Sequence, residues 1–312
     1  RRGAFMSAMN QSRGAMVRIG RSLERIVTAP RRLARLPREN RELRATLKKS
    51  TKKVTELERR TAEQLAEISR LKALIKRLRT AELHRLLPEP VAQVAESVID
   101  RRLTLLSIGP LTSLAQALID VQLAGVPGLI IEAGTARGGS AIVLATAKSP
   151  DRRLMVYDVF GMIPPPSDKD GDDVHRRYRR IKSGNARGGQ EYYGYRDNLY
   201  EEVKASFAEF GLPVEQSGVE LVRGLFQDTI ALDQPVAFAH VDGDWYESTM
   251  TCLQRIVPWL SVGGRLVIDD YFMWSGCRTA VDEYFAGRNE FELVPGQRLQ
   301  VIRLVESNAA VG

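Results

Sequence analysis

Aspartates gather in two short segments of the chain, at positions 242 and 244 and again at positions 269 and 270. Each segment follows a run of apolar, β-branched residues that predicts a buried strand. If the two strands are neighbours in a parallel sheet, their carboxyl ends bring three or four carboxylates together. Such carboxylates repel one another and raise each other's pKa, and a hard divalent cation relieves the repulsion. We therefore predict an Mg²⁺ site with Asp242, Asp269 and Asp270 as ligands.

Some residues of these two segments also have structural explanations. Asp244 and Asp270 could each cap the N-terminus of the helix that follows, as single aspartates often do. His240 lies two residues before Asp242, and therefore on the same face of the strand but deeper in it. We interpret His240 as mainly structural, with a catalytic role as the alternative.

A glycine-rich segment, E-A-G-T-A-R-G-G-S at 132–140, separates a predicted strand (128–133) from a predicted helix (138–147). Glycine permits a tight turn and a close approach of the backbone to a ligand, and the helix N-terminus offers free N–H groups to an anion. The segment is not a P-loop, because no Gly-Lys-Ser/Thr follows, and it does not have the G-x-G-x-x-G spacing. A purely structural turn is the alternative.

A second predicted strand (154–158) ends in Asp158, 20 residues after Gly138. An acid in this place can accept hydrogen bonds from the hydroxyls of a ribose, whereas an ordinary turn or capping role is the alternative. Together with the glycine-rich segment, Asp158 indicates an adenosine-containing ligand. A nicotinamide cofactor and S-adenosylmethionine both satisfy this pattern.

The elements that must position these residues alternate between strands and helices from about residue 88 onward. This alternation predicts an α/β domain at 88–312 with a Rossmann-like, doubly wound, mostly parallel sheet. Ligands of such sheets bind beyond the carboxyl ends of the strands. Further strands are predicted at 219–222, 236–241, 264–269 and 299–304, and helices at 246–260 and 277–285.

The segment before this domain has a heptad pattern that predicts a coiled coil at 39–87. Eight of the twelve a and d positions between Asn40 and Leu78 are apolar, and no Pro or Gly interrupts them. Branched residues at a and Leu at d favour a parallel dimer, so we expect a homo-oligomer, although Ser50, Thr61 and Gln64 weaken the seam. A single solvated helix is the alternative.

Residues 1–38 form a basic arm in which apolar residues recur at three- and four-residue steps between arginines. Residues 1–80 carry 23 Lys/Arg against 7 Asp/Glu, whereas the rest of the chain carries 23 against 31. A basic amphipathic helix can lie on an anionic membrane surface, and an upstream continuation of the coil is the alternative. Nucleic-acid binding is disfavoured, because no aromatic residues interleave the arginines.

Composition limits the class of protein. With 44% hydrophobic and 27% charged residues, the chain is neither disordered nor collagen-like, and no apolar run is long enough for a transmembrane helix. Cys252 and Cys277 are too few for a disulfide framework or a cysteine zinc site. No apolar core of a signal peptide follows the N-terminal basic pair. We expect a cytoplasmic protein, with peripheral attachment to the inner membrane surface as an extension.

These motifs resemble the macrocin O-methyltransferase family over about residues 105–305. The strings H-V-D-G-D-W-Y-E-S-T, P-W-L-S-V-G-G-R-L-V-I-D-D-Y and W-S-G-C-R-T-A-V-D-E-Y carry the resemblance. E-A-G-T-A-R-G-G-S is similar to that family's cofactor loop, Y-D-V-F-G-M-I-P-P-P to its second-strand segment and G-L-F-Q-D-T to its next cofactor-facing loop. One departure is that Phe160 runs directly into Gly161, without the usual acid between them.

The resemblance implies a bacterial, metal-dependent enzyme that methylates a sugar hydroxyl, with S-adenosylmethionine and Mg²⁺ as cofactors. It implies that Asp244 is the general base and that Asp242 has a catalytic role beside metal binding. The residues around S-adenosylmethionine would be Glu132, Gly134, Ser140, Asp158, Gln227 and Asp228. Two other functions are kept as alternatives: an NAD-dependent oxidoreductase, and an inactive coiled-coil scaffold with a nucleoside-binding module.

Two features bear on the acceptor. Residues 160–200 form a long insertion, which we predict to be a substrate-covering lid that orders when the cofactor binds. Tyr192, Tyr193 and Tyr195 of this insertion could stack on sugar rings or could anchor the lid. A polysaccharide or glycolipid acceptor fits a tethered, coiled-coil enzyme better than a free glycosylated natural product does.

Overall fold

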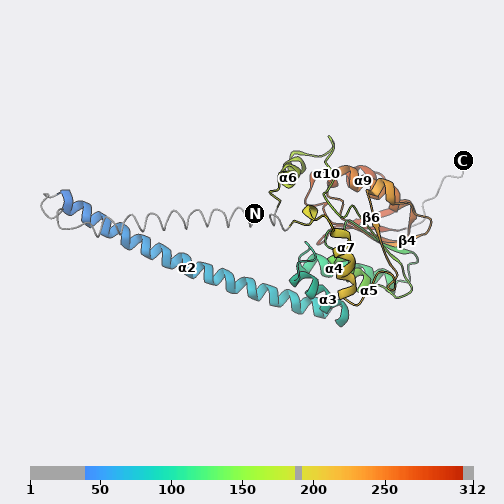
Figure 1. Cartoon of the computed structure of the whole chain (residues 1–312), viewed down its shortest axis with the longest axis horizontal. Coiled ribbons are helices and arrows are strands. Elements are labelled where there is room, and N and C mark those ends of the chain that lie inside the picture. The colour runs from blue at the N-terminus through green and yellow to red at the C-terminus, as the bar shows by residue number, and fades with distance from the viewer. Residues whose placement is uncertain (1–38, 187–191, 305–312) are drawn as a thin grey trace. The chain divides into compact units, whose positions relative to one another are not determined.

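The computed structural model describes residues 39–186 and 192–304. A long helix, α2 (Glu39–Leu86), precedes an α/β domain (Figure 1). The basic arm at 1–38, with its predicted membrane contact, lies outside the described residues. Within the described ranges, no helix is both long and apolar enough to cross a membrane.

Seven strands form a single sheet in the order β3-β2-β1-β4-β5-β7-β6. The neighbours from β3 to β5 pair in parallel, whereas β7 pairs antiparallel with both β5 and β6. The predicted α/β sheet is confirmed, and its C-terminal hairpin makes it a mixed sheet. The strands are β1 (Leu129–Ala133), β2 (Leu154–Asp158), β3 (Val219–Arg223), β4 (Val236–Val241), β5 (Leu260–Ile268), β6 (Phe291–Val294) and β7 (Leu299–Arg303).

Helices cover both faces of this sheet (Figure 1). Ile130 and Phe238 point into a core shared with α3, α4, α5 and α7, whereas Ile131 and Ala239 point into a core shared with α9 and α10. Burial on both faces explains why the strands are continuous apolar runs. The helices are α3 (Glu89–Asp100), α4 (Ile108–Leu123), α5 (Gly139–Ala147), α6 (Asp172–Lys182), α7 (Leu199–Glu209), α8 (Phe226–Thr229), α9 (Tyr246–Ile256) and α10 (Ser275–Phe285).

The prediction of one helix over 246–260 is wrong at its end. α9 stops at Ile256, a short 3₁₀ turn (Val257–Trp259) follows, and β5 begins at Leu260, four residues earlier than expected. Pro258 lacks the N–H that the helix would need, and it therefore ends the helix. β6 was not predicted, because its four residues have only one buried side chain, Phe291.

The insertion at 160–200 is anchored to the two loops that carry the clustered aspartates. Asp170 Oδ1 accepts a hydrogen bond from the backbone N–H of Tyr246, the first residue of α9, at 2.8 Å. Asp173 Oδ2 accepts one from the N–H of Ser275, the first residue of α10, at 3.0 Å. Each aspartate thus satisfies a helix N-terminal donor that has no partner within its own helix.

One of the three insertion tyrosines clearly anchors α6. The Tyr195 hydroxyl donates to the carbonyl of Ile181 and accepts from the N–H of Ala186. Tyr192 is buried in a small cluster with the same two residues. These contacts support the anchoring interpretation of the tyrosines over sugar stacking for Tyr192 and Tyr195.

We predict that Asp170→Ala lowers the free energy of unfolding by about 1–2 kcal/mol, because it removes a helix-terminal hydrogen bond. For a domain of this size the melting temperature should fall by roughly 2–8 °C in a calorimetric scan. Asp168→Ala is the matched control, because Asp168 is exposed and lies two residues away. Equal melting temperatures for the two variants would show that Asp170 does not anchor the insertion.

Candidate active site

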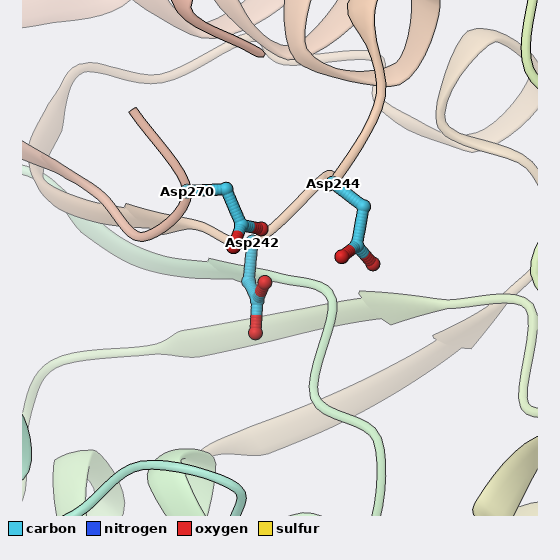
Figure 2. Close-up of side chains that lie close together, drawn as sticks. All are labelled: Asp242, Asp244 and Asp270. Atoms are coloured by element: carbon cyan, nitrogen blue, oxygen red, sulfur yellow. The ribbon is translucent and has the colours of Figure 1, made fainter. Parts of the chain in front are cut away.

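Three aspartates converge beyond the carboxyl ends of β4 and β5 (Figure 2). Val241 and Ile268, the last residues of these two strands, are register partners, so the loops that follow are neighbours. Asp242, Asp244 and Asp270 each offer a carboxylate oxygen, and the three oxygens lie within 4.8 Å of one another. The structure thus brings together three of the four aspartates that the sequence predicts to lie at the ends of two neighbouring strands.

The backbone of the β4–α9 loop holds Asp244 in a conformation that few residues adopt. Asp244 has a φ of +55°, in the left-handed region that Asp tolerates better than most non-glycine residues. The N–H of Trp245 donates to the carbonyl of Gly243 at 2.6 Å, which closes the loop tightly. Residues held in this way are often part of a functional site.

Charge repulsion makes this cluster unfavourable on its own. Although Asp242 and Asp244 are only half-buried, the surrounding protein desolvates their carboxylates and raises the pKa of each well above its usual range, and the neighbouring aspartates add to this effect. Burial and the charge of Asp269 raise the pKa of Asp270 to about 6. Arg177 of α6 and the Trp274 indole act in the opposite direction on Asp244.

The cluster has the donor set that a hard divalent cation requires. Asp270 is 4% exposed, and its Oδ2 has no hydrogen-bond partner among the described residues. A buried carboxylate oxygen without a partner is costly. Mg²⁺ binds carboxylate oxygens and retains several waters, so the three aspartates fit this ion chemically.

Asp269 lies beside this cluster and has cationic partners of its own. Its Oδ1 accepts a hydrogen bond from Arg298 Nε at 2.5 Å and lies 3.6 Å from His240 Nε2. Burial opposes the charged form of Asp269, but His240 and Arg298 outweigh burial and hold its pKa below the usual range. Asp269 is therefore not one of the three converging carboxylates, and its assignment as a metal ligand stays a prediction.

His240 connects Asp269 to the first strand of the sheet. His240 Nδ1 lies 3.1 Å from Glu132 Oε2, and the Ser140 hydroxyl donates to Glu132 Oε1. Glu132 is 0% and His240 1% exposed, so neither can reach solvent. Burial opposes the charged form of His240, but Glu132 and Asp269 outweigh it and raise the pKa of the imidazole to about 10. Both carboxylate oxygens of Glu132 are thus occupied by protein groups.

Asp158 is also occupied by protein groups. Its Oδ2 accepts from the N–H groups of Thr135 (2.7 Å) and Ala136 (3.1 Å), and its Oδ1 accepts from the N–H of Phe160 (2.6 Å). Burial raises the pKa of Asp158, and the three N–H groups act against that rise. In this structure Asp158 holds the glycine-rich segment in place, and its contact with a ribose stays a prediction.

Gly134 brings the glycine-rich segment against the loop that carries Asp242. Its φ is +90°, and a Cβ placed on it would overlap the carbonyl oxygen of Asp242. Only glycine permits this approach. The two remaining predicted residues, Gln227 and Asp228, lie exposed in α8, and the loop before α8 is tied to β2 by the N–H of Gly224, which donates to the carbonyl of Asp158.

Two basic residues of this site were not predicted from the sequence. Arg298 belongs to the loop between β6 and β7, and Arg177 is one arginine of a basic run in α6. Neither stands in a recognisable motif. The only available signal was the excess of carboxylates, which indicates that some basic side chain must lie nearby.

We predict that Gly134→Ala destabilises the domain by roughly 3 kcal/mol or more, because a clash adds to backbone strain. Gly211→Ala separates the two effects, since Gly211 also has a left-handed φ, +73°, but has no atom within 4 Å of the position that a Cβ would take. The control should lose only about 1 kcal/mol. Urea unfolding followed by circular dichroism measures both, and similar losses would contradict the close approach at Gly134.

The chain is similar to known O-methyltransferases in both sequence and structure. Residues 44–293 match the family described as Macrocin-O-methyltransferase (TylF). The demethyldecarbamoylnovobiocin O-methyltransferase of Streptomyces niveus is 34% identical over 189 residues, which are 59% of this chain and 68% of that protein. The 8-demethyl-8-(2,3-dimethoxy-alpha-L-rhamnosyl)-tetracenomycin-C 4'-O-methyltransferase of Streptomyces olivaceus is 35% identical over 187 residues, which are 58% and 67% of the two chains.

The solved structure of the O-methyltransferase NovP superposes with a TM-score of 0.55 at 30% identity, over 65% of this chain and 82% of that chain. Membership of the matched family decides between the two adenosine-containing ligands in favour of S-adenosylmethionine as the methyl donor, against the oxidoreductase alternative. The chain belongs to the macrocin O-methyltransferase (TylF) family and is an S-adenosylmethionine-dependent O-methyltransferase.

Proposed function

We propose that the enzyme transfers the methyl group of S-adenosylmethionine to a hydroxyl of a saccharide, with Mg²⁺ at the ends of β4 and β5. The observation that carries this proposal is the group formed by Asp242, Asp244 and Asp270, with its unpartnered buried oxygen, next to the glycine-rich segment. The name of the Streptomyces olivaceus relative describes a rhamnosyl-bearing acceptor, which supports a sugar hydroxyl here.

The donor would lie at the edge formed by the glycine-rich segment. The N-terminus of α5 follows this segment, and the partial positive charge of that helix end would favour the donor's carboxylate, although the first N–H of the helix, that of Gly139, already donates to the carbonyl of Leu103. Glu132 and Asp158 would support the donor site indirectly, because their carboxylates already accept hydrogen bonds from Ser140 and from the backbone of the segment. Gln227 and Asp228, which are exposed, would contact the adenosine part of the donor.

The acceptor hydroxyl is a weak nucleophile, so its proton must leave as the new bond forms. With S-adenosylmethionine and the acceptor bound, the new carbon–oxygen bond would form as the carbon–sulfur bond breaks with its electron pair going to sulfur, and a carboxylate oxygen of Asp244 would take the hydroxyl proton. Asp244 is the member of the aspartate group that we assign as this base, because its carboxylate lies beside those of Asp242 and Asp270, which would hold the ion. Asp242 and Asp270, with Asp269 as a further ligand, would hold Mg²⁺. Mg²⁺, when bound, lowers the pKa of the hydroxyl and orients it.

Within the saccharide class, we propose a polysaccharide or a glycolipid as the acceptor, with a glycosylated natural product as the second candidate. The chain has a long helix, α2, before its catalytic domain. If that helix tethers the enzyme, an acceptor that is itself held in place fits it better than an acceptor that diffuses freely. Attachment through the basic arm to an anionic membrane surface would support the same role. Binding of the full chain to anionic vesicles at low salt tests that attachment.

We also propose that α2 pairs with α2 of a second copy as a parallel coiled coil. Its apolar seam is exposed in the single chain, with Leu43 71% and Leu78 61% accessible. In a parallel, in-register pair, residues at g positions lie beside residues at e positions of the partner. Lys53 would then lie beside Glu58 of the partner subunit, and Glu67 beside Lys72 of the partner subunit, so that each pair joins opposite charges. The exposed seam residues are Leu43, Val54, Leu57, Ile68, Leu71, Ile75 and Leu78.

The coiled coil predicts that Leu57→Asp/Leu71→Asp converts a dimer into a monomer, because buried carboxylates in the seam are unfavourable. Light scattering on the full chain at about 10 μM measures the mass; a seam of this length should give a stable pair at that concentration. Ala66→Asp is the control, because Ala66 is exposed at the outer f position of the heptad. A monomeric wild type would contradict the proposal.

The catalytic proposal predicts that Asp270→Asn abolishes Mg²⁺ binding while S-adenosylhomocysteine still binds, because the donor and ion sites use different side chains. Calorimetric titration of each ligand measures this, and Asp233→Asn is the control at an exposed aspartate.

With an acceptor found by screening glycans for S-adenosylhomocysteine release, Asp244→Asn should lower kcat by about 10²- to 10⁴-fold, because the base that takes the hydroxyl proton is lost. If the wild type does not bind S-adenosylhomocysteine, the proposed function is wrong.

A further inference from the structure

A buried chain of polar side chains runs from the glycine-rich segment to the edge that carries the aspartates. It joins the first turn of α5, β1, β4, the end of β5 and the loop before β7. All five members are largely buried, and two of them, Glu132 and His240, are inaccessible to solvent. In order, the members are Ser140, Glu132, His240, Asp269 and Arg298.

The sheet fixes the centre of this chain. Glu132 and His240 are register partners on β1 and β4, so their side chains emerge on the same face of the sheet at neighbouring positions. The ladder continues past the strand ends, because Asp242 N–H donates to the carbonyl of Ala133 and Asp269 N–H donates to that of Val241. The backbone of His240 therefore cannot move relative to the backbones of Glu132 and Asp269 without breaking hydrogen bonds, so only small side-chain shifts can change the contacts of the ring.

His240 makes a hydrogen-bond contact through one ring nitrogen but not through the other. Nδ1 is at hydrogen-bond distance from Glu132, 3.1 Å, whereas Nε2 lies 3.6 Å from Asp269 Oδ1 and has no hydrogen-bond partner among the described residues. A buried donor without a partner is costly, and a shift of a few tenths of an ångström by Asp269 would satisfy it. Arg298 holds the same oxygen of Asp269, so the other carboxylate oxygen is left for a different partner.

We propose that His240 is a positioning residue that couples binding of the methyl donor to binding of the divalent cation. The proposal rests on the proposed function, which places the donor at the glycine-rich segment and the cation at the aspartates. A methyl donor bound at the glycine-rich segment would restrain Ser140, and Ser140 restrains Glu132 through its hydrogen bond. Glu132 in turn holds the imidazole through Nδ1. The imidazole then holds Asp269, whose neighbour Asp270 belongs to the converging carboxylates.

His240 is not a catalytic residue in this scheme. It is 1% exposed, and both ring nitrogens face carboxylates of the protein, so no face of the ring is left for a substrate hydroxyl. Its effect passes through Asp269, as hydrogen-bonded outer partners orient the ligands of a metal ion.

The consequence is a reciprocal effect between two ligands. If Mg²⁺ tightens the binding of S-adenosylhomocysteine by some factor, S-adenosylhomocysteine must tighten the binding of Mg²⁺ by the same factor. We expect a factor of about 5 or more in the wild type. Calorimetric titrations of each ligand, with and without the other at saturation, measure this factor directly.

The informative variant is His240→Asn, whose amide nitrogen can replace Nδ1 toward Glu132 but does not reach Asp269. We expect affinity for S-adenosylhomocysteine in the absence of Mg²⁺ to change by less than about threefold. Mg²⁺ affinity should fall by about 10- to 100-fold, and the coupling factor should approach one. His240→Gln, whose amide nitrogen replaces Nε2 and not Nδ1, should keep more of the Mg²⁺ affinity but lose the coupling.

His84→Asn is the matched control, because His84 is a surface histidine of α2 that pairs with Glu89 and Glu96. It should leave both affinities and the coupling factor unchanged. Wild-type coupling in His240→Asn would overturn the inference, and so would equal losses of both affinities together with a fall in melting temperature. A wild type that binds neither ligand would instead overturn the proposed function.

Discussion

The constraint on which the structure depends is the burial of like charges at the ends of two adjacent parallel strands. The pairing of Val241 with Ile268 brings the aspartates after β4 and β5 to one place, and the surrounding protein removes the water that would screen them. The fold compensates for only part of this charge, since Arg298 and His240 both contact Asp269. Asp242, Asp244 and Asp270 are left with a shared deficit of positive charge, which a divalent cation would remove.

Acidic residues of the same type thus have different roles that depend on what surrounds them. Asp158 and Glu132 are buried, but backbone N–H groups, a serine and a histidine occupy their oxygens, so they act as structural acceptors. Asp170 and Asp173 accept hydrogen bonds from the first N–H groups of α9 and α10, the helices that follow the two aspartate loops. Where such donors are missing, a buried carboxylate keeps an oxygen without a partner, as Asp270 does among the described residues.

The sequence predicted the elements whose signals are local. The apolar runs of β1, β2 and β4, the glycine-rich segment and the aspartates at strand ends were all found from neighbouring residues. It did not predict the partner of Asp269, because Arg298 is 29 residues away and reaches it only through an antiparallel hairpin whose edge strand was missed. For the same reason the ribose interpretation of Asp158 did not anticipate the three N–H groups that occupy it, since Thr135 and Ala136 become its neighbours only after β1 pairs with β2.

The register of the sheet also explains why donor and cation sites need not be independent. A doubly wound sheet places the first βα turn and the ends of the next strands on one edge, and here β1 and β4 are direct neighbours. Any side chain at the end of β4 therefore contacts the strand that leads into the glycine-rich segment on one side and β5 on the other. His240 occupies that position with a ring whose two nitrogens point in different directions, Nδ1 toward Glu132 and Nε2 toward Asp269. A residue with a single polar atom could satisfy only one of them, whereas the two nitrogens of the imidazole can face both neighbours.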